Sequence, residues 1–195
     1  MLILASKSPR RSMLLREINV DFEVIESNYE EKHDISSDPA RLATLHAQSK
    51  AEEVFGRVKG GADDVILGVD TLVTLNGEIF GKPKNASDAF EMIKKLSGHT
   101  HQVLSAMCLI RTRDEKKITH IEITEVTFHK LSDEQIEEYI QTNEWEDKAG
   151  AYAIQGQASG FVSAIEGSFS NVVGLPKEVF LDLYDKLIGT KRKLC

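Results

Sequence analysis

The chain of 195 residues is 41% hydrophobic and 28% charged, which suits one globular domain or two small lobes that share a core. Its formal net charge of −7 argues against a general nucleic-acid surface. No apolar run approaches the roughly 20 residues that a membrane-spanning helix needs, and the opening MLILA is too short for a signal peptide. We therefore expect a cytoplasmic protein that is not embedded in a membrane and does not bind nucleic acid.

The first part of the chain predicts alternating strands and helices. In order these are a buried strand at 2–5, a helix at 9–17, a strand at 22–25, a helix at 39–55, and two strands at 65–75 and 78–80. Asp38 before Pro39 marks the start of the second helix. Asn76-Gly77 lies between the last two strands and predicts a tight hairpin.

The second part predicts a helix at 86–96, a long hairpin of strands 103–110 and 118–128 that turns at 113–115, a helix up to residue 140, a glycine-rich segment at 150–173 with short strands, and a helix at 176–188. Ser132 and Gln135 form a capping box. The apolar phase changes near Thr124, which predicts a bulge or a bend there. Strands interleaved with helices and hairpins indicate an α/β fold with a mixed sheet.

A basic loop, SKSPRR at residues 6–11, follows the first strand directly. Ser8 is a suitable N-cap, so Arg10 and Arg11 fall in the first helical turn. Cations there oppose the helix dipole, whereas free backbone N–H groups, the hydroxyls of Ser6 and Ser8 and two guanidinium groups suit an anion. This stretch alone leaves two readings equal, an anion site or a basic surface loop.

Asp70 lies within the otherwise apolar run VILGVDTLVTL, where a carboxylate is costly unless a cation, a metal or a hydrogen-bond donor compensates it. A two-residue turn at Asn76-Gly77 would bring Thr71 opposite Lys82 if the following glycine does not break the ladder. A carboxylate, a hydroxyl and an amine would then converge at one end of the hairpin. The structural alternative is an aspartate that accepts hydrogen bonds from backbone amides at a strand end.

Three further polar positions are unusual. Lys50 falls on the small-residue face of its predicted helix, so it either covers apolar surface with its stem or reaches into a site. Glu30 and Glu31 offer a second carboxylate for a hard metal, or form a charged surface run. Gln155 lies among small residues in DKAGAYAIQG, and its amide offers the donor and acceptor that match the imide edge of a pyrimidine; an ordinary surface glutamine is the alternative.

Together these stretches resemble the Maf family of nucleoside triphosphate pyrophosphatases, nearly end to end. The motifs that carry the resemblance are, in order, LASKSPRR, the Glu30-Glu31 pair, Lys50 in AQSKAE, GVDTLV, FGKP, KLSGHTH, DKAGAYAIQG and GSFSNVVGLP. The resemblance implies one domain over residues 1–195, with an α/β fold, a mixed sheet and two lobes around an elongated anion-binding cleft, similar to inosine triphosphate pyrophosphatases. It also implies a homodimer, dependence on Mg²⁺ or Mn²⁺, and hydrolysis of a nucleotide to its monophosphate and pyrophosphate.

The resemblance extends to a branch of the family. Members that act on dTTP and UTP carry Arg, Thr and Gln at the positions occupied here by Arg10, Thr71 and Gln155. Members of the 7-methyl-GTP branch carry Trp, Gln and Glu at the same positions. The resemblance therefore implies the dTTP/UTP branch, with Gln155 on the base.

Side-chain chemistry then suggests a role for each candidate. Asp70 would serve as general base or metal ligand, Glu31 as the second metal ligand, Arg10, Arg11, Lys50 and Lys82 as phosphate-binding cations, and Ser6 and Ser8 as hydrogen-bond donors. Two alternatives stay open. One is a regulatory or nucleic-acid-binding protein that acts on septum formation, and the other is a house-cleaning pyrophosphatase for modified or non-standard nucleotides.

Overall fold

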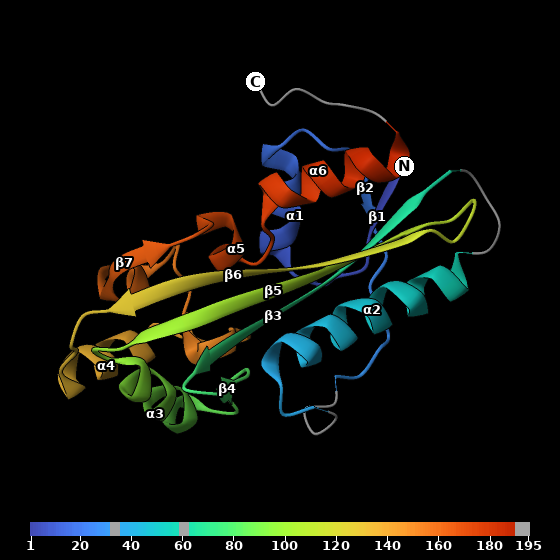
Figure 1. Cartoon of the computed structure of the whole chain (residues 1–195). Coiled ribbons are helices and arrows are strands. Elements are labelled where there is room, and N and C mark those ends of the chain that lie inside the picture. The colour runs from blue at the N-terminus through green and yellow to red at the C-terminus, as the bar shows by residue number, and fades with distance from the viewer. Residues whose placement is uncertain (32–35, 59–62, 190–195) are drawn as a thin grey trace. The chain divides into compact units, whose positions relative to one another are not determined.

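A computed structural model describes residues 1–31, 36–58 and 63–189 (Figure 1). Its elements are β1 (Leu2–Leu4), α1 (Pro9–Glu17), β2 (Phe22–Val24), α2 (Pro39–Arg57), β3 (Val65–Leu75), β4 (Glu78–Phe80), α3 (Ala86–Leu96), β5 (Thr100–Arg111), β6 (Lys117–Phe128), α4 (Asp133–Ile140), the short 3-10 helices η1 (Ala149–Ala151) and η2 (Gln157–Phe161), β7 (Val162–Glu166), α5 (Phe169–Val173) and α6 (Lys177–Ile188). The predicted order of helices and strands is confirmed, and most predicted bounds are correct within a few residues.

The described strands form one mixed sheet of seven, in the order β2-β1-β3-β5-β6-β7, with β4 paired to β3 beside this path. β1 pairs in parallel with both β2 and β3. The hairpin β3–β4 and the pair β6–β7 are antiparallel. The predicted α/β fold with a mixed sheet is therefore confirmed.

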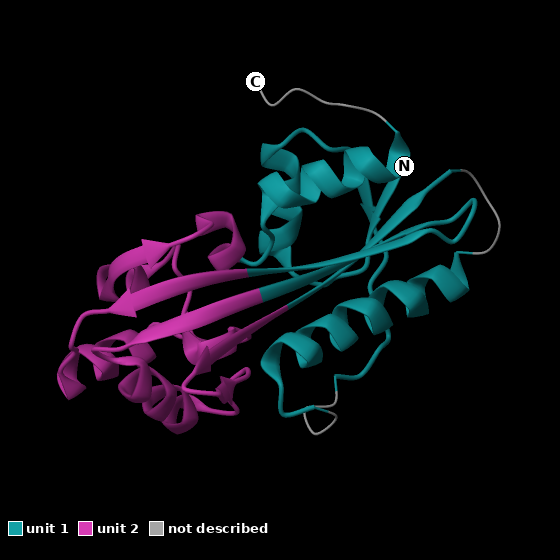
Figure 2. Cartoon of the chain, in the orientation of Figure 1, with its two compact units in different colours: residues 1–70, 105–122, 174–195 teal, residues 71–104, 123–173 magenta. Residues whose placement is uncertain are grey.

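The chain divides into two compact units, coloured separately in Figure 2. Unit 1 comprises Met1–Asp70, Ser105–Glu122 and Gly174–Cys195, and unit 2 comprises Thr71–Leu104 and Ile123–Val173. Three boundaries between the units fall inside long strands. They follow Asp70 in β3, Leu104 in β5 and Glu122 in β6. The two expected lobes thus exist, and each is built from chain segments that are distant in sequence.

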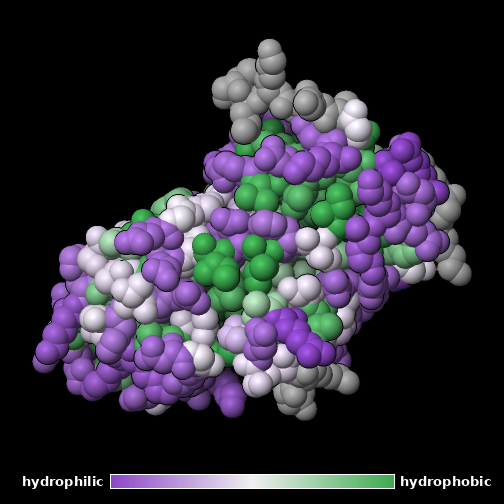
Figure 3. Space-filling view, in the orientation of Figure 1, coloured by the Kyte–Doolittle hydropathy of each residue, from purple (hydrophilic) through white to green (hydrophobic). Residues whose placement is uncertain are grey.

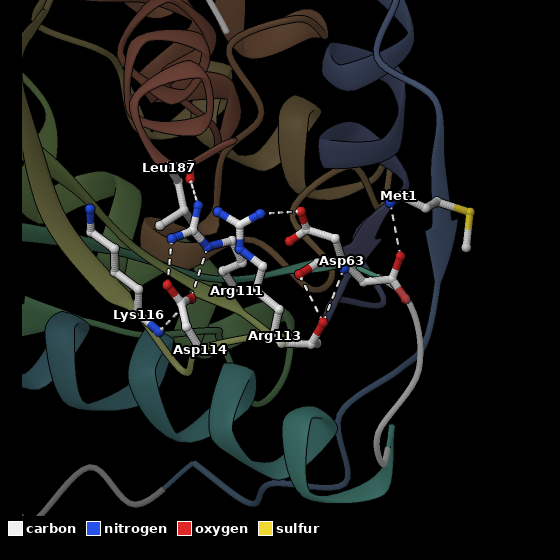
Figure 4. Close-up of polar contacts among 9 residues, drawn as sticks. Met1, Asp63, Arg111, Arg113, Asp114, Lys116 and Leu187 are labelled. Carbon is white, nitrogen blue, oxygen red and sulfur yellow. Dashed lines mark hydrogen bonds and ion pairs between the residues drawn. The ribbon is translucent and has the colours of Figure 1, made fainter. Parts of the chain in front are cut away.

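Charged groups fasten the turn of the β5–β6 hairpin within unit 1 (Figure 4). The Arg111 guanidinium donates to both carboxylate oxygens of Asp114 and to the backbone carbonyl of Leu187 near the end of α6. The hydrogen bonds from Arg111 lower the pKa of the Asp114 carboxyl to about 2. Arg113 pairs with Asp63 at 2.8 Å, so two arginines tie this turn to neighbouring segments of unit 1.

The change of apolar phase in β6 coincides with a buried polar residue, Thr124. Ile123 is exposed, whereas Thr124 is fully buried and its hydroxyl accepts a hydrogen bond from the Asn171 amide at 2.9 Å. A polar residue therefore takes the inward position because a buried partner satisfies it. The register irregularity in the β6–β7 pairing lies further on, between Thr127 and Phe128.

The surface is mainly hydrophilic on the face that Figure 3 shows. Among the described residues, the large hydrophobic side chains that are exposed are Met1, Val24, Ile123 and Phe169. No helix in the described part of the chain is long and apolar enough to span a bilayer.

Candidate active site

Asp70 lies beside Lys50 because β3 and α2 approach very closely within unit 1. A Cβ atom at Gly68 would lie 2.1 Å from the backbone oxygen of Ala47 in α2, so only glycine fits at this position. Lys50 follows Ala47 by about one helical turn, and its Nζ lies 2.6 Å from Asp70 Oδ1. Asp70 is only 4% exposed, so this contact supplies the compensating cation that a carboxylate in an apolar strand requires.

Lys50 also contacts the predicted second carboxylate. Its Nζ lies 2.6 Å from Glu31 Oε1, so one ammonium group bridges Glu31 and Asp70. The structure therefore supports the reading in which Lys50 reaches past small residues into a polar cluster. We call these three residues, Glu31, Lys50 and Asp70, the carboxylate–lysine cluster.

One face of α2 holds the loop that carries Glu31. Arg57 donates to the backbone oxygen of Glu26 at 2.5 Å, and the backbone N–H of Asn28 donates to Glu53. The Tyr29 hydroxyl and His46 Nδ1 are 3.1 Å apart. With the Lys50–Glu31 pair, these contacts fasten segment 26–31 along α2 and fix the place of the second carboxylate. Sequence reasoning missed them, although His46, Lys50, Glu53 and Arg57 recur at the spacing of one helical face.

The basic loop is held by its own side chains. Arg11 donates to Ser6 Oγ at 2.9 Å and to the Gly174 carbonyl at 3.0 Å, and the backbone N–H of Ser8 also donates to Ser6 Oγ. Ser8 occupies the predicted N-cap position of α1, but its side chain makes no capping hydrogen bond.

Arg11 is buried close to the carboxylate–lysine cluster. Burial lowers the pKa of its guanidinium to about 10, an effect that the Asp70 and Glu31 charges oppose and that the Arg10 charge reinforces. Arg11 is still cationic at neutral pH. The predicted site residues of unit 1, namely Ser6, Ser8, Arg10, Arg11, Glu31, Lys50 and Asp70, therefore gather around the end of β1, the start of α1 and the side of α2 that faces β3.

The remaining candidates belong to unit 2. Thr71 is half-buried and follows Asp70 directly on β3. The β3–β4 ladder pairs Leu75 with Glu78 as predicted but ends at Val73 and Phe80, so the expected pairing of Thr71 with Lys82 is wrong. The chain leaves the ladder at Gly81, whose carbonyl instead accepts a hydrogen bond from the Gly150 backbone.

Lys82 and Gln155 have exposed side chains within unit 2. Lys82 Nζ lies 4.0 Å from Asp147 Oδ1, and the two side chains are 59% and 90% exposed. Such an exposed pair contributes little to stability, so the lysine can change partner at small cost. Gln155 lies in the turn before η2, and its side chain is exposed.

The carboxylate–lysine cluster fits a divalent metal in one specific respect. Asp70 Oδ2 is buried and has no hydrogen-bond partner among the described residues. A buried carboxylate oxygen of this kind suits a hard cation, with Glu31 as the second ligand. The described segments contain no group of three or more His, Cys, Asp or Glu side chains that could complete a protein cage. Mg²⁺ typically binds to one or two carboxylates together with substrate phosphates and water, which matches this donor set.

The site thus combines a mixed α/β fold with a buried carboxylate–lysine cluster close to the cationic Arg11. The comparison with protein families is more specific, because the model of the Maf-like proteins matches residues 1–187. The chain belongs to the Maf-like protein family, and the resemblance noted from its motifs is confirmed.

Curated relatives match over most of their length. A dTTP/UTP pyrophosphatase of Alkaliphilus oremlandii is 48% identical over 175 residues, which are 90% of each chain. A dTTP/UTP pyrophosphatase of Ruminiclostridium cellulolyticum is 42% identical over 187 residues, which are 95% of each chain. Among solved structures, the Ham1 protein of Staphylococcus aureus aligns with 82% of this chain and 90% of its own at 14% identity, with a TM-score of 0.48.

Proposed function

We propose that this protein hydrolyses dTTP and UTP to the nucleoside monophosphate and pyrophosphate. Relatives of 42–48% identity bear the name dTTP/UTP pyrophosphatase over most of the chain. The observation that carries the proposal is Asp70, a buried carboxylate with one oxygen on Lys50 and the other without a partner among the described residues. In this reaction a water oxygen bonds to the α-phosphorus, the bond from that phosphorus to the bridging oxygen breaks, and pyrophosphate leaves.

Asp70 Oδ2 is the atom that would act on the water or on a metal. Oδ1 is held by Lys50, which fixes the orientation of the carboxylate. An oriented carboxylate with a free oxygen can accept the proton that water releases as it attacks. The same oxygen could instead ligate a metal, and measuring metal binding in an Asp70→Asn variant separates the two roles.

The cations of unit 1 would bind the triphosphate. Arg10 and Arg11 lie in the first turn of α1, and Lys50 lies between the two carboxylates. Guanidinium and ammonium groups donate charge-assisted hydrogen bonds to phosphate oxygens and stabilise negative charge that develops on the leaving group. Ser6 would keep Arg11 oriented, because its hydroxyl already accepts a hydrogen bond from that guanidinium.

Mg²⁺ or Mn²⁺ is part of the proposal, held by Asp70 and Glu31. When bound there, the metal would neutralise phosphate charge and polarise the phosphoryl oxygen. The contribution of the chain is to keep the two carboxylates together, which Lys50 does by contacting both.

The residues of unit 2 would set the choice of nucleotide. Lys82 has an exposed ammonium group that could pair with phosphate. The exposed Gln155 amide can accept from the N3–H of uracil or thymine and donate to a neighbouring carbonyl. A site that hydrogen-bonds one base edge rejects a base with the opposite pattern, because its polar groups are then left unpaired.

A nucleotide panel tests this proposal. Purified protein is incubated with dTTP, UTP, CTP, dATP and 7-methyl-GTP in the presence of Mg²⁺ or Mn²⁺, and pyrophosphate and orthophosphate are measured separately. We expect pyrophosphate from dTTP and UTP, and little product from the purine nucleotides. Release of orthophosphate with a nucleoside diphosphate would refute the reaction, whereas equal turnover of every nucleotide would refute only the specificity.

A further inference from the structure

The loop that carries Gln155 is fastened by an acidic side chain that no motif singled out. Glu144 Oε2 accepts a hydrogen bond from the backbone N–H of Gln157 at 2.8 Å. Glu144 is half-buried, and both residues belong to unit 2. The Glu144 carboxylate thus binds the backbone two residues after Gln155, the residue that we propose contacts the base.

Gly156 and Glu144 form a matched pair. A Cβ atom at position 156 would lie 2.0 Å from Glu144 Oε2 and 2.8 Å from Glu144 Cδ. The backbone at Gly156, with φ −118° and ψ −153°, is extended and open to any residue. A side chain at position 156 would therefore displace the Glu144 carboxylate, although the backbone conformation itself would accept one.

The segment that carries Glu144 is itself held to α4. The Glu144 backbone N–H donates to Thr142 Oγ1 at 3.1 Å, and the Thr142 hydroxyl donates to the Tyr139 carbonyl at 2.7 Å. The Trp145 indole donates to the Ile140 carbonyl at 2.9 Å. The carboxylate is thus presented from a fixed turn at the end of a helix.

The Gln155 turn is tight on its own side as well. The Gly156 backbone N–H donates to the Ala153 carbonyl at 3.1 Å, and the Ser159 backbone N–H donates to the Gly156 carbonyl at 3.0 Å. Gln155 lies inside the turn that the Gly156–Ala153 hydrogen bond closes, and it directly precedes Gly156. A shift of Gly156 or Gln157 would therefore move the Gln155 backbone and redirect its side-chain amide.

We propose that Glu144 is a positioning residue for base recognition: its carboxylate, seated against Gly156 and bonded to Gln157, fixes the direction of the Gln155 amide. This inference rests on the proposed function, in which Gln155 contacts uracil or thymine. Directional hydrogen bonds lose strength quickly when donor and acceptor are misaligned, and a displacement of about 1 Å can cost about 100-fold in rate. Glu144 therefore acts on specificity without contacting the nucleotide.

UTP and CTP are the best probes, because uracil and cytosine differ in the donor and acceptor pattern of the edge that Gln155 would contact. The quantity to measure is the ratio of kcat/KM for UTP to kcat/KM for CTP, from pyrophosphate release. We expect Glu144→Ala to lower this ratio by at least about tenfold, mainly by slowing UTP. Glu144→Gln should stay within about threefold of the unaltered protein, since its amide oxygen can still accept from Gln157. Glu146→Ala, an exposed acidic residue in the same turn, is the matched control and should leave the ratio unchanged.

A double-variant cycle separates positioning from general loosening of the fold. In a Gln155→Ala background, Glu144→Ala should change the ratio no further, because the residue it positions is gone. If Glu144→Ala does not fold, Gly156→Ala provides the same test from the other side, since its Cβ displaces the carboxylate. We expect it to lower the ratio to a similar extent.

The outcomes distinguish this inference from the proposed function. If Gln155→Ala lowers the ratio but folded Glu144→Ala and Gly156→Ala proteins keep it, Glu144 is only structural and the inference is wrong. If the unaltered protein hydrolyses UTP and CTP equally well, the role of Gln155 and the inference both fail, while the hydrolase assignment stands.

Discussion

At the scale of single residues, the proposed chemistry depends on a negative charge placed where the surrounding strand is apolar. Asp70 is almost completely buried, and Lys50 is the cation in contact with it. The sequence alone identified both residues as unusual, because each breaks the apolar or small-residue pattern of its element. It could not show that they contact each other, since that depends on the close approach of β3 and α2 at Gly68.

Asp70→Asn should retain the shape of the side chain and remove its charge and basicity. Loss of a general base typically lowers the rate by roughly 10²- to 10⁴-fold, so we expect kcat for UTP to fall within that range. The measurement is pyrophosphate release at saturating metal and nucleotide. Asp21→Asn, an exposed aspartate in unit 1, is the control. Near-normal turnover of Asp70→Asn would make Asp70 a structural residue.

Lys50→Met should destabilise the protein. The side chains of Lys50 and Asp70 are 12% and 5% exposed, so the substitution leaves a buried carboxylate without its cation. Removal of one partner of a buried ion pair costs roughly 3 kcal/mol or more of the free energy of unfolding. Urea unfolding measures this loss. The double variant Lys50→Met/Asp70→Asn should recover much of it, because the unpaired charge is then absent; a double variant as unstable as the single one would contradict this account.

At the scale of elements, local signals were sufficient for most helices and strands. The capping box of Ser132 and Gln135 is present as predicted, and Asp38 caps α2 with its side chain. The failed prediction concerns the length of the β3–β4 ladder. The β3–β4 ladder ends before Thr71 because the chain turns away at Gly81 toward Gly150, a residue distant in sequence. Local hydrogen-bond patterns do not contain that information.

Two glycines should respond in opposite ways to the same substitution. At Gly68 a Cβ would collide with the backbone of Ala47 and Ala51, so Gly68→Ala must separate β3 from α2 and should destabilise the fold by more than about 2 kcal/mol. At Gly56, within α2, a Cβ meets no atom of the described chain within 4 Å. Gly56→Ala should therefore stabilise the protein by about 0.5–1 kcal/mol through helix propensity.

Thermal or urea unfolding of both glycine variants tests this contrast. Gly68→Ala should also reduce pyrophosphate release, because it displaces Lys50 relative to Asp70, whereas Gly56→Ala should leave it unchanged. Equal stability of the two variants would show that α2 and β3 do not approach as closely as described.

At the scale of the whole molecule, the division into two units could not be read from composition. Three of the four boundaries, at Asp70/Thr71, Leu104/Ser105 and Glu122/Ile123, lie inside continuous strands with no linker between the units. Only the fourth, at Val173/Gly174, coincides with a glycine and the end of a helix. Length and composition allowed either one domain or two small lobes, and the resemblance of the motifs to a known family favoured the two lobes. The carboxylate–lysine cluster lies in unit 1, and the loop that carries Gln155 lies in unit 2.

The stability of the whole chain should fall on mild acidification because of His101 in unit 2. His101 is 1% exposed, its Nε2 lies 2.8 Å from the Tyr152 hydroxyl, and burial lowers its pKa from 6.5 to about 4, against a smaller opposite effect of a backbone hydrogen bond at His99. Between these two values the unfolded chain binds a proton that the folded chain does not. The contribution of His101 is therefore complete above pH 6.5 and declines as the pH falls toward 4.

This contribution amounts to at most roughly 3 kcal/mol, and it can be isolated by difference. We expect the free energy of unfolding, measured in urea from about pH 7.5 to about pH 4.5, to decline less in His101→Gln than in the unaltered protein, since glutamine does not titrate. His129→Gln, at an exposed position in the same unit, should preserve the original decline. The same pH dependence in all three proteins would mean that the pKa of His101 does not differ between the folded and the unfolded chain, so that its burial against Tyr152 and Phe128 is not maintained in solution.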